Sequence, residues 1–313
     1  MGHQNEELQK AIDLTGLQGK TVVMSGGSRG IGHSIAVQLG AAGADLVLLA
    51  KTGEPHPTLE GTVHTAVADI EAAGGRGLAV VGDLRRDEDV ARAVDSAAET
   101  FGGIDIVINN ASAIDLSPTQ ALDMKRYDLM HDINVRGTFL LSKLAAPHLR
   151  ASAEQGRSPQ ILTLSPPLTG ADGRLDPQWF GKHLAYTMAK YGMSMTTIGL
   201  AQELAGGKGA AGVAVNSLWP VTLIETAAIR SLAEKSAGAG QQEQSEAMLR
   251  GSRRPEIVAD AATALLAGAV TEGGELATGQ FLTDEDVLRA VGIEDFSGYA
   301  VDPEAQLAPD IFL

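Results

Sequence analysis

A glycine-rich turn near the N-terminus constrains the fold of this chain more than any other stretch. Residues 21–25, Thr-Val-Val-Met-Ser, form the short apolar run expected of a buried parallel strand. The sequence Gly26-Gly27-Ser28-Arg29-Gly30-Ile31-Gly32 follows, and residues 33–42 continue with a helical pattern. Glycines at such a turn let the backbone approach a pyrophosphate, and the helix N-terminus presents free N–H groups to it. The stretch therefore favours a dinucleotide-binding site over an ordinary turn between a strand and a helix.

Strands and helices are expected to alternate along most of the remaining chain. Ala, Gly, Val and Leu are abundant, which suits closely packed βαβ units. We therefore predict an α/β fold, a single Rossmann-type doubly wound parallel sheet of about seven strands with helices on both faces. Further strands are expected at 45–50, 78–81, 104–108, 160–164, 213–218 and 279–282, and long helices at 87–101, 126–149 and 185–205. One domain is expected over 1–313, with a core at about 17–283, an insertion at 166–183, a lid at 222–251 and a C-terminal extension at 284–313.

Charge and residue usage exclude several classes of function. The chain carries 24 basic and 39 acidic residues, a formal charge of −15, which argues against a nucleic-acid-binding surface. It has no cysteine, so disulfides and thiolate metal sites are excluded, and its seven histidines lack the spacing of metal ligands. The N-terminus shows no signal region, and no apolar run is long enough for a membrane span. We expect a cytoplasmic protein with no metal.

The residue after the second expected strand bears on the choice of cofactor. Lys51 stands where an acidic residue would hydrogen-bond the ribose 2′-hydroxyl of NAD(H), and Arg29 lies in the glycine turn. Two cations and no carboxylate favour a 2′-phosphate, so NADP(H) is predicted over NAD(H). The alternative is that Lys51 is only a solvated loop residue. Asp83 and Leu84, at the end of the third strand, are expected near the adenine ring.

A tyrosine and a lysine four residues apart supply candidate chemistry. Tyr186 and Lys190 would lie one turn apart on one face of a helix. A neighbouring cation favours phenolate and lowers the pKa of a tyrosine, which makes it a usable acid and base. Taken alone, the pair is equally typical of an exposed helical surface.

Five motifs in order resemble the short-chain dehydrogenase/reductase family. They are Ser25-Gly26-x3-Gly30-x-Gly32, Asp83, Asn109-Asn110-Ala111, Asn134-Val135-x-Gly137 and Tyr186-x3-Lys190. Further matches, at 50–57, 165–167, 185–195, 219–220 and 310–313, resemble a hydroxysteroid dehydrogenase-like branch of the family. Members of that branch typically carry an additional C-terminal sterol-carrier-like domain, which we expect these 313 residues to lack.

The resemblance implies roles for individual residues. Tyr186 would be the acid/base, Lys190 would lower its pKa and hold the cofactor ribose, and Asn134 would support a water relay or satisfy a helix kink. Ser165 would polarise the substrate carbonyl. The residues expected to bind the cofactor are Gly26, Ser28, Arg29, Gly30, Ile31, Gly32, Lys51, Asp83, Leu84, Asn110, Ala111, Tyr186, Lys190, Pro220, Thr222 and Ile224.

Departures from the family pattern concentrate at the substrate. Ser112 replaces the usual glycine after Asn109-Asn110-Ala111, and Val221 replaces the glycine of a Pro-Gly pair. Pro166 occupies the position of the family's second serine, so either Ser165 is re-aimed, or another donor replaces it, or carbonyl activation is weak. His183 precedes Tyr186 by one helical turn and either lines the pocket or has no catalytic role.

The sequence therefore predicts an NADP(H)-dependent short-chain oxidoreductase that interconverts a carbonyl and an alcohol on an apolar, lipid-, acyl- or steroid-like substrate. A catalytically weak NADP(H)-binding or lipid-sensing protein, or a structural subunit of a lipid-processing assembly, are the alternatives. A homodimer or homotetramer is expected through the two long helices. The apolar walls are expected from Trp179, Phe180, Met188, Met193 and Trp219, and the extension, with Phe296, Tyr299 and Phe312, is expected to cover the pocket or a neighbouring subunit.

Overall fold

The structure is a computed structural model that describes residues 12–55, 60–170, 173–206, 212–238, 240, 242–272 and 274–313. His56 and Pro57, Asp172 of the predicted insertion, and positions 239 and 241 of the predicted lid lie outside the described residues.

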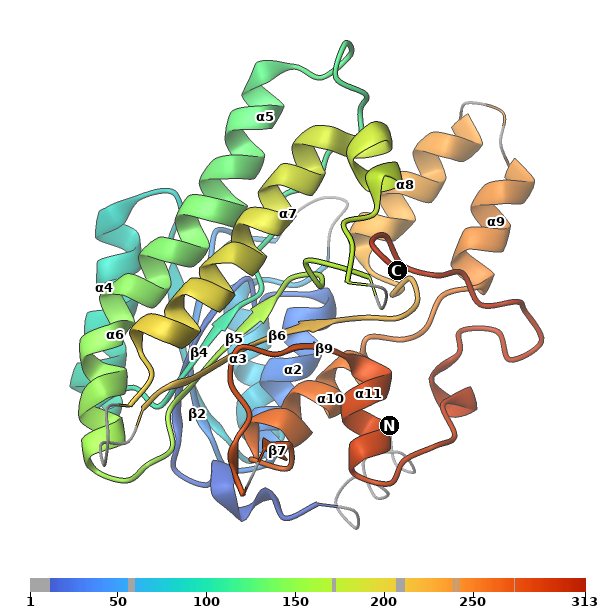
Figure 1. Ribbon diagram of the computed structural model, residues 1–313. Coiled ribbons are helices and arrows are strands. Elements are labelled where there is room, and N and C mark those ends of the chain that lie inside the picture. The colour runs from blue at the N-terminus through green and yellow to red at the C-terminus, as the bar shows by residue number, and fades with distance from the viewer. Residues whose placement is uncertain are drawn as a thin grey trace.

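A single parallel sheet forms the centre of the molecule (Figure 1). The strand order is β3-β2-β1-β4-β5-β6-β9, and every neighbouring pair is parallel. The predicted Rossmann-type sheet of about seven strands is therefore confirmed, with the reversal of strand order between β1 and β4. The strands span Thr21–Ser25 (β1), Asp45–Ala50 (β2), Arg76–Val81 (β3), Ile106–Asn109 (β4), Gln160–Leu164 (β5), Ala214–Trp219 (β6) and Phe281–Thr283 (β9), and a separate antiparallel pair joins Thr271–Glu272 (β7) to Glu275–Leu276 (β8).

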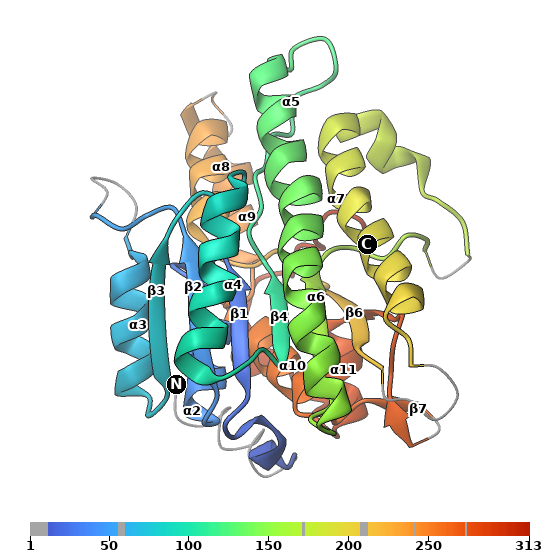
Figure 2. The same ribbon diagram turned by 90° about the vertical axis from the view of Figure 1, so that its left-hand side faces the viewer.

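Helices cover both faces of the sheet, as Figure 2 shows for the face in front. One face carries α2 (Gly30–Ala41), α3 (Val63–Ala72), α10 (Glu256–Leu266) and α11 (Asp284–Ala290). The other carries α4 (Asp87–Phe101), α6 (Thr138–Glu154) and α7 (Pro177–Glu203). The remaining helical segments are η1 (Leu14–Leu17), α5 (Met124–Met130), the π-helical turn η2 (His131–Gly137), α8 (Ala227–Gly238), α9 (Gln242–Arg250) and η3 (Ser297–Tyr299). No helix of the described residues is long and apolar enough to cross a membrane.

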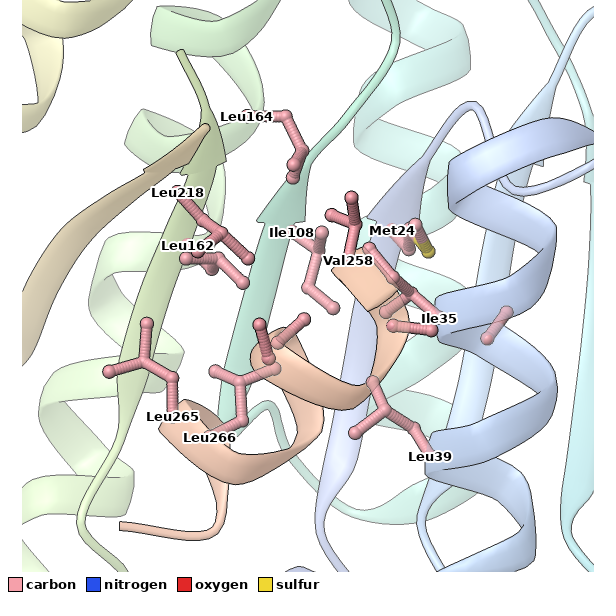
Figure 3. Close-up of a cluster of buried hydrophobic side chains, with 14 of the residues drawn as sticks. Met24, Ile35, Leu39, Ile108, Leu162, Leu164, Leu218, Val258, Leu265 and Leu266 are labelled. Carbon is pink, nitrogen blue, oxygen red and sulfur yellow. The ribbon is translucent and has the colours of Figure 1, made fainter. Parts of the chain in front are cut away.

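The apolar side chains of the strands are buried against these helices. Figure 3 shows the cluster in which Met24 of β1 and Ile108 of β4 meet Ile35 of α2 and Val258 of α10, all fully buried. Burying one such side chain stabilises the fold by roughly 1.5–3 kcal/mol. Since both faces are packed in this way, the strands are fixed in register and their carboxyl ends form one edge.

Two helix predictions were wrong in extent. The predicted helix at 185–205 begins at Pro177, because Asp176 caps it and proline suits the first turn. Its kink at His183, where the backbone is non-helical, separates the added turns from the rest. The predicted helix at 126–149 is interrupted by the π turn η2. The end of the predicted insertion is thus helical, and the described part of the predicted lid forms α8 and α9.

Candidate active site

The carboxyl ends of β1 and β4 bring two predicted segments together. Ser25 pairs with Asn109 across the sheet, so the glycine turn and Asn110 follow neighbouring strands. The Asn110 side-chain amide donates to the Gly26 carbonyl at 2.8 Å, and the Gly26 N–H donates to the Leu49 carbonyl at 2.9 Å. These bonds fix the turn at the point where the strand order reverses, the usual ligand position in such sheets.

The glycines in this turn are required by space and by backbone conformation. Gly26 and Gly30 adopt φ values of +76° and +57°, which side chains rarely tolerate. A Cβ on Gly32 would lie 2.4 Å from the Asn110 amide nitrogen. The first turn of α2 has no side-chain cap, so no side chain at the N-cap position accepts from its N–H groups. A cradle that only glycine permits, ahead of an uncapped helix N-terminus, fits a pyrophosphate.

A cleft of about 390 Å³ opens above this cradle. It is lined by eleven of the sixteen residues predicted to bind the cofactor, namely Gly26, Ser28, Arg29, Gly30, Ile31, Gly32, Lys51, Asp83, Leu84, Asn110 and Ala111. Lys51 is exposed at the end of β2, with Nζ 3.9 Å from the Asp83 carboxylate. The cleft thus presents cations at one end and free backbone amides at the other.

Arg85 is a cleft residue that the sequence analysis missed. Its guanidinium donates to both carboxylate oxygens of Asp83 and lowers the pKa of that carboxyl to about 2, with a smaller contribution from Lys51. Asp83 is therefore ionised at neutral pH, and its charge is matched by neighbouring cations. The sequence signal that could have found Arg85 is its position two residues after Asp83, which lets the arginine side chain fold back onto the carboxylate.

Lys190 is buried beside the end of β5. Its Nζ donates to the Leu164 carbonyl at 2.6 Å and lies 4.7 Å from the centre of the Trp219 ring. Burial lowers the pKa of Lys190 to about 7, and the Asp310 carboxylate opposes this shift. Lys190 therefore titrates near neutral pH.

Tyr186 lies on the same helix face and is 6% exposed. Burial raises the pKa of its phenol, the Asp310 carboxylate raises it further, and a hydrogen bond with the Ser112 side chain opposes both effects. The expectation that Lys190 lowers the pKa of Tyr186 is therefore wrong. The phenol is therefore protonated at neutral pH.

Asn134 is fully buried in the π turn and bonds twice to one residue. Its Oδ1 accepts from the Ala113 N–H at 2.8 Å, and its Nδ2 donates to the Ala113 carbonyl at 3.0 Å. Turns of this kind often occur at functional sites. Here the turn aims Asn134 at the loop after β4, so Ser112, the residue before Ala113, is held beside Tyr186. Both bonds go to this loop and not to the backbone of the turn, so the kink interpretation and the water relay both stay predictions.

Comparison with known proteins identifies the family. The sequence profile of the short chain dehydrogenase family matches residues 20–237. The chain is 47% identical over 297 residues to hydroxysteroid dehydrogenase-like protein 2 of Danio rerio, covering 95% of this chain and 64% of the relative. A crystal structure of a short chain dehydrogenase from Mycobacterium thermoresistibile is 45% identical, with a TM-score of 0.80 over 95% of this chain and 96% of that one. This chain belongs to the short-chain dehydrogenase family.

Two further results of the comparison concern the length of a relative and a relative with a bound cofactor. The chain spans 64% of the length of the Danio rerio relative. A short chain dehydrogenase from Burkholderia cenocepacia, solved in complex with NADP, is 30% identical, with a TM-score of 0.63 over 85% of this chain and 96% of that one. The predicted similarity to the hydroxysteroid dehydrogenase-like branch is confirmed.

The structure places the Ser165 hydroxyl beside Ser217 of the neighbouring strand β6. The hydroxyl is fully buried and donates to the Ser217 hydroxyl at 3.2 Å. The next residue, Pro166, accepts a hydrogen bond from Ser194 through its carbonyl at 2.7 Å. Ser112 is the serine that contacts Tyr186. The catalytic role of Ser165 stays a prediction, and Ser112 becomes a second candidate.

Three further residues predicted to bind the cofactor, Pro220, Thr222 and Ile224, lie outside the cleft lining. Pro220 and Thr222 are buried, and the Thr222 hydroxyl has no hydrogen-bond partner among the described residues. The backbone of Thr222 bridges to Pro309, and that of Ile224 bridges to Arg253. An unpartnered buried hydroxyl in this position fits a polar group such as a carboxamide.

The C-terminal extension divides between the core and the site. Tyr299 is buried against α10, where its hydroxyl bonds to Asp260, and Phe296 packs in the same core cluster. Phe312 lies instead in the cluster around Tyr186. Of the predicted apolar walls, Trp179, Phe180 and Trp219 join that cluster, whereas Met188 is 42% exposed. Met193 is fully buried, and its sulfur accepts a hydrogen bond from Lys190 at 3.5 Å. The His183 Nδ1–H donates a hydrogen bond to the Leu116 carbonyl at 3.0 Å. Within the described ranges, no group of three or more His, Asp or Glu side chains is arranged to hold a metal ion.

Proposed function

We propose that this chain is an NADP(H)-dependent oxidoreductase that interconverts a carbonyl and an alcohol on an apolar substrate. The observation that carries the proposal is the placement of Tyr186. Its phenol is buried among aromatic side chains and contacts Ser112, which itself lines the cofactor cleft. A proton donor therefore lies between the dinucleotide cradle and an apolar cluster.

Three cations support a cofactor with a 2′-phosphate. Arg29, Lys51 and Arg85 line the cleft, and Asp83, the carboxylate beside two of them, is already paired. A second anion at this end would be attracted rather than repelled. The Burkholderia cenocepacia relative binds NADP, which supports the same choice.

The chain's own residues supply the proton and the position. Bound NADP(H) supplies or accepts a hydride at the substrate carbon. Tyr186, whose phenol is protonated at neutral pH, gives its proton to the carbonyl oxygen during reduction. Ser112 or Ser165 donates a hydrogen bond to the same oxygen. Lys190 would hold the cofactor ribose.

The apolar character of the substrate follows from the surroundings of Tyr186. Trp179, Tyr191 and Trp219 gather around it. Such a cluster offers dispersion contacts and few hydrogen bonds, which favours lipid-, acyl- or steroid-like molecules. The name of the Danio rerio relative supports a hydroxysteroid among the compounds to be tested.

Oxidation of NADPH in the presence of ketones, aldehydes, acyl thioesters and ketosteroids tests the proposal. Turnover of at least one apolar carbonyl is expected, with the matching alcohol recovered as product. Absence of turnover across the whole panel, with NADPH bound, would favour the alternative.

The alternative is a catalytically weak NADP(H)-binding or lipid-sensing protein. It is favoured by one observation, the direction of the Ser165 hydroxyl toward Ser217. Without a hydroxyl on the carbonyl oxygen, hydride transfer would be slow. NADPH binding that responds to apolar ligands without turnover is the result expected from this alternative.

We also propose self-association through α6 and α7. Phe139 on α6 is 51% exposed, and Met188 and Met195 on α7 are 42% and 61% exposed. Apolar side chains of this size on two long helices suit a homodimer or homotetramer interface. A Phe139→Asp and Met195→Asp double variant is expected to shift the mass measured by light scattering toward the monomer, whereas Met124→Asp on α5 is not.

A further inference from the structure

The last residues of the chain run back into the candidate active site. The backbone N–H of Leu223 donates to the Ala308 carbonyl at 3.0 Å, and that of Asp310 donates to the Val221 carbonyl at 3.0 Å. The indole N–H of Trp219 donates to the Ile311 carbonyl at 2.8 Å. Figures 1 and 2 both place the C-terminal end beside α7. The segment after β6 and the C-terminal segment 308–313 are therefore held together by hydrogen bonds.

Phe312 is the centre of the aromatic cluster. Its ring centroid lies 5.7 Å from that of Trp179, 6.0 Å from Tyr186, 5.5 Å from Tyr191 and 5.8 Å from Trp219. The side chain is 7% exposed. Four ring contacts within these distances place Phe312 against the acid/base residue itself and against both tryptophans of the chain.

The backbone of Phe312 is held in a conformation that a bulky residue seldom adopts. Its φ is +81°, in the left-handed region. Such a conformation persists only where the surroundings determine it, and it often marks a functional position. Here the hydrogen bonds made by the Asp310 N–H and the Ile311 carbonyl, together with the aromatic contacts, provide those surroundings. The ring is thus aimed at Tyr186 by the path of the segment.

The C-terminal segment also brings a titratable carboxyl, that of Asp310, close enough to influence Tyr186 and Lys190. The Asp310 carboxyl accepts a hydrogen bond from the Ile311 N–H at 2.6 Å. Burial raises the pKa of this carboxyl, and the Lys190 ammonium opposes the shift. Asp310 also influences the pKa of Tyr186. The segment therefore contributes both an apolar and a titratable side chain to the surroundings of Tyr186 and Lys190.

We propose that Phe312 is a specificity-determining residue, whose ring forms the wall that limits the size of the apolar group bound beside Tyr186. This inference rests on the proposed function. A wall is favoured over a removable plug because backbone hydrogen bonds and the Trp219 indole fix the segment. A substrate whose carbonyl reaches the Tyr186 phenol brings its apolar group against the Phe312 ring. Removing the ring lengthens the space available to that group.

A series of methyl ketones of increasing chain length tests the wall. The Phe312→Ala variant is expected to shift the highest kcat/KM toward longer ketones, because each buried methylene contributes about fourfold in binding. Over three added methylenes, the ratio of long-chain to short-chain kcat/KM is expected to rise at least tenfold relative to the unmodified protein. Phe312→Leu keeps an apolar side chain for the case in which alanine prevents folding, and a smaller shift in the same direction is expected. Leu313→Ala, at an exposed neighbour in the same segment, is the matched control and leaves the ratio unchanged.

A second readout does not require turnover. Trp179 and Trp219 are the only tryptophans in the sequence, and both contact Phe312, so their fluorescence reports ligands at the wall. Titration with unreactive primary amides, from butanamide to decanamide, measures affinity against chain length. Phe312→Ala and Phe312→Leu are expected to favour the longer amides, even if the unmodified protein reduces no ketone and the proposed function fails. An unchanged preference in both variants, or an equal loss for every chain length, overturns the assignment.

Discussion

The cofactor cleft and the aromatic cluster lie at the same edge of the sheet and are built in opposite ways. The cleft comes from loops that directly follow β1, β2, β3 and β4, and its defining contacts are made by backbone and by glycine. The cluster comes from α7, the end of β6 and the C-terminal segment, and its contacts are made by large side chains. The cleft therefore depends on local geometry, whereas the cluster depends on tertiary packing.

Two lysines show what this difference does to one kind of side chain. Lys51 in the cleft has a side chain that is 77% exposed, so its ammonium is in contact with water. Lys190 in the cluster is 2% exposed, and burial brings its pKa to about 7. An exposed ammonium is suited to attracting a phosphate, and a buried one to a site where protonation changes near neutral pH.

The largest effect is expected at Tyr186, in the cluster. Tyr186→Phe removes the proton donor and keeps the ring that packs against Phe312. Turnover is expected to fall by about 10³-fold or more, as for loss of a general acid, while NADPH affinity persists. Steady-state kinetics and NADPH titration measure the two quantities. Tyr191→Phe, at a buried tyrosine in the same cluster, is the matched control and retains activity within about threefold of the unmodified protein. Activity of Tyr186→Phe close to that of this control would falsify the role of the phenol.

The contrast between the regions also explains what could be predicted from the sequence. The cradle was predictable because Gly26 and Gly30 report backbone conformation, which is a local property. The pair Tyr186–Lys190 was predictable because helical spacing puts both on one face. The direction of the Ser165 hydroxyl depends on Ser217 in the neighbouring strand, and no pattern in the sequence encodes that register directly.

Two further features could not be predicted from the sequence because they depend on contacts between residues far apart in the chain. The extension was expected to cover the pocket or a neighbouring subunit. Phe312 packs in the cluster around Tyr186, whereas Phe296 and Tyr299 pack in the core around α10. The raised pKa of Tyr186 was missed for a similar reason. Helical spacing indicated a nearby cation, but the phenol is buried, and the Asp310 carboxylate reaches it from the far end of the chain.

The second largest effect concerns the hydroxyl on the carbonyl oxygen, at the border of the two regions. Ser112→Ala is expected to lower kcat about 10²-fold, since loss of one hydrogen bond to a developing oxyanion costs a factor of this order. Ser165→Ala is expected to cost less than about tenfold, because its hydroxyl is engaged with Ser217. Comparing kcat of the two variants decides between them. A larger loss in Ser165→Ala would return the role to the residue predicted from sequence and would mean that its side chain turns toward Tyr186 during catalysis.

The pH dependence of NADPH use tests the role of the Lys190 ammonium. The pKa of Lys190 is lowered to about 7, so the ammonium is present below that pH and is lost as the pH rises through it. If the charge holds the cofactor ribose, kcat/KM for NADPH falls above pH 7 by about tenfold per unit, the slope for loss of one required proton. Lys190→Arg keeps its charge throughout this range and is expected to flatten the profile. A profile that is flat to pH 9 in the unmodified protein would show that the ammonium is not required.

The smallest effect is expected in the cleft, at Lys51. Lys51→Ala removes one exposed cation from the end of β2, and exposed ion pairs contribute only about 1 kcal/mol, or about fivefold in affinity. Affinity for NADPH is therefore expected to fall about fivefold while affinity for NADH stays within twofold, and added salt should reduce the difference because it screens exposed charges. Titration of both cofactors at two salt concentrations measures this, with the exposed Lys125→Ala on α5 as the control for net charge. Since Arg29 and Arg85 remain in the cleft, some preference for NADPH should survive the substitution. Tighter binding of NADH by the unmodified protein would reverse the assignment of the cofactor and leave Lys51 as the partner of Asp83 alone.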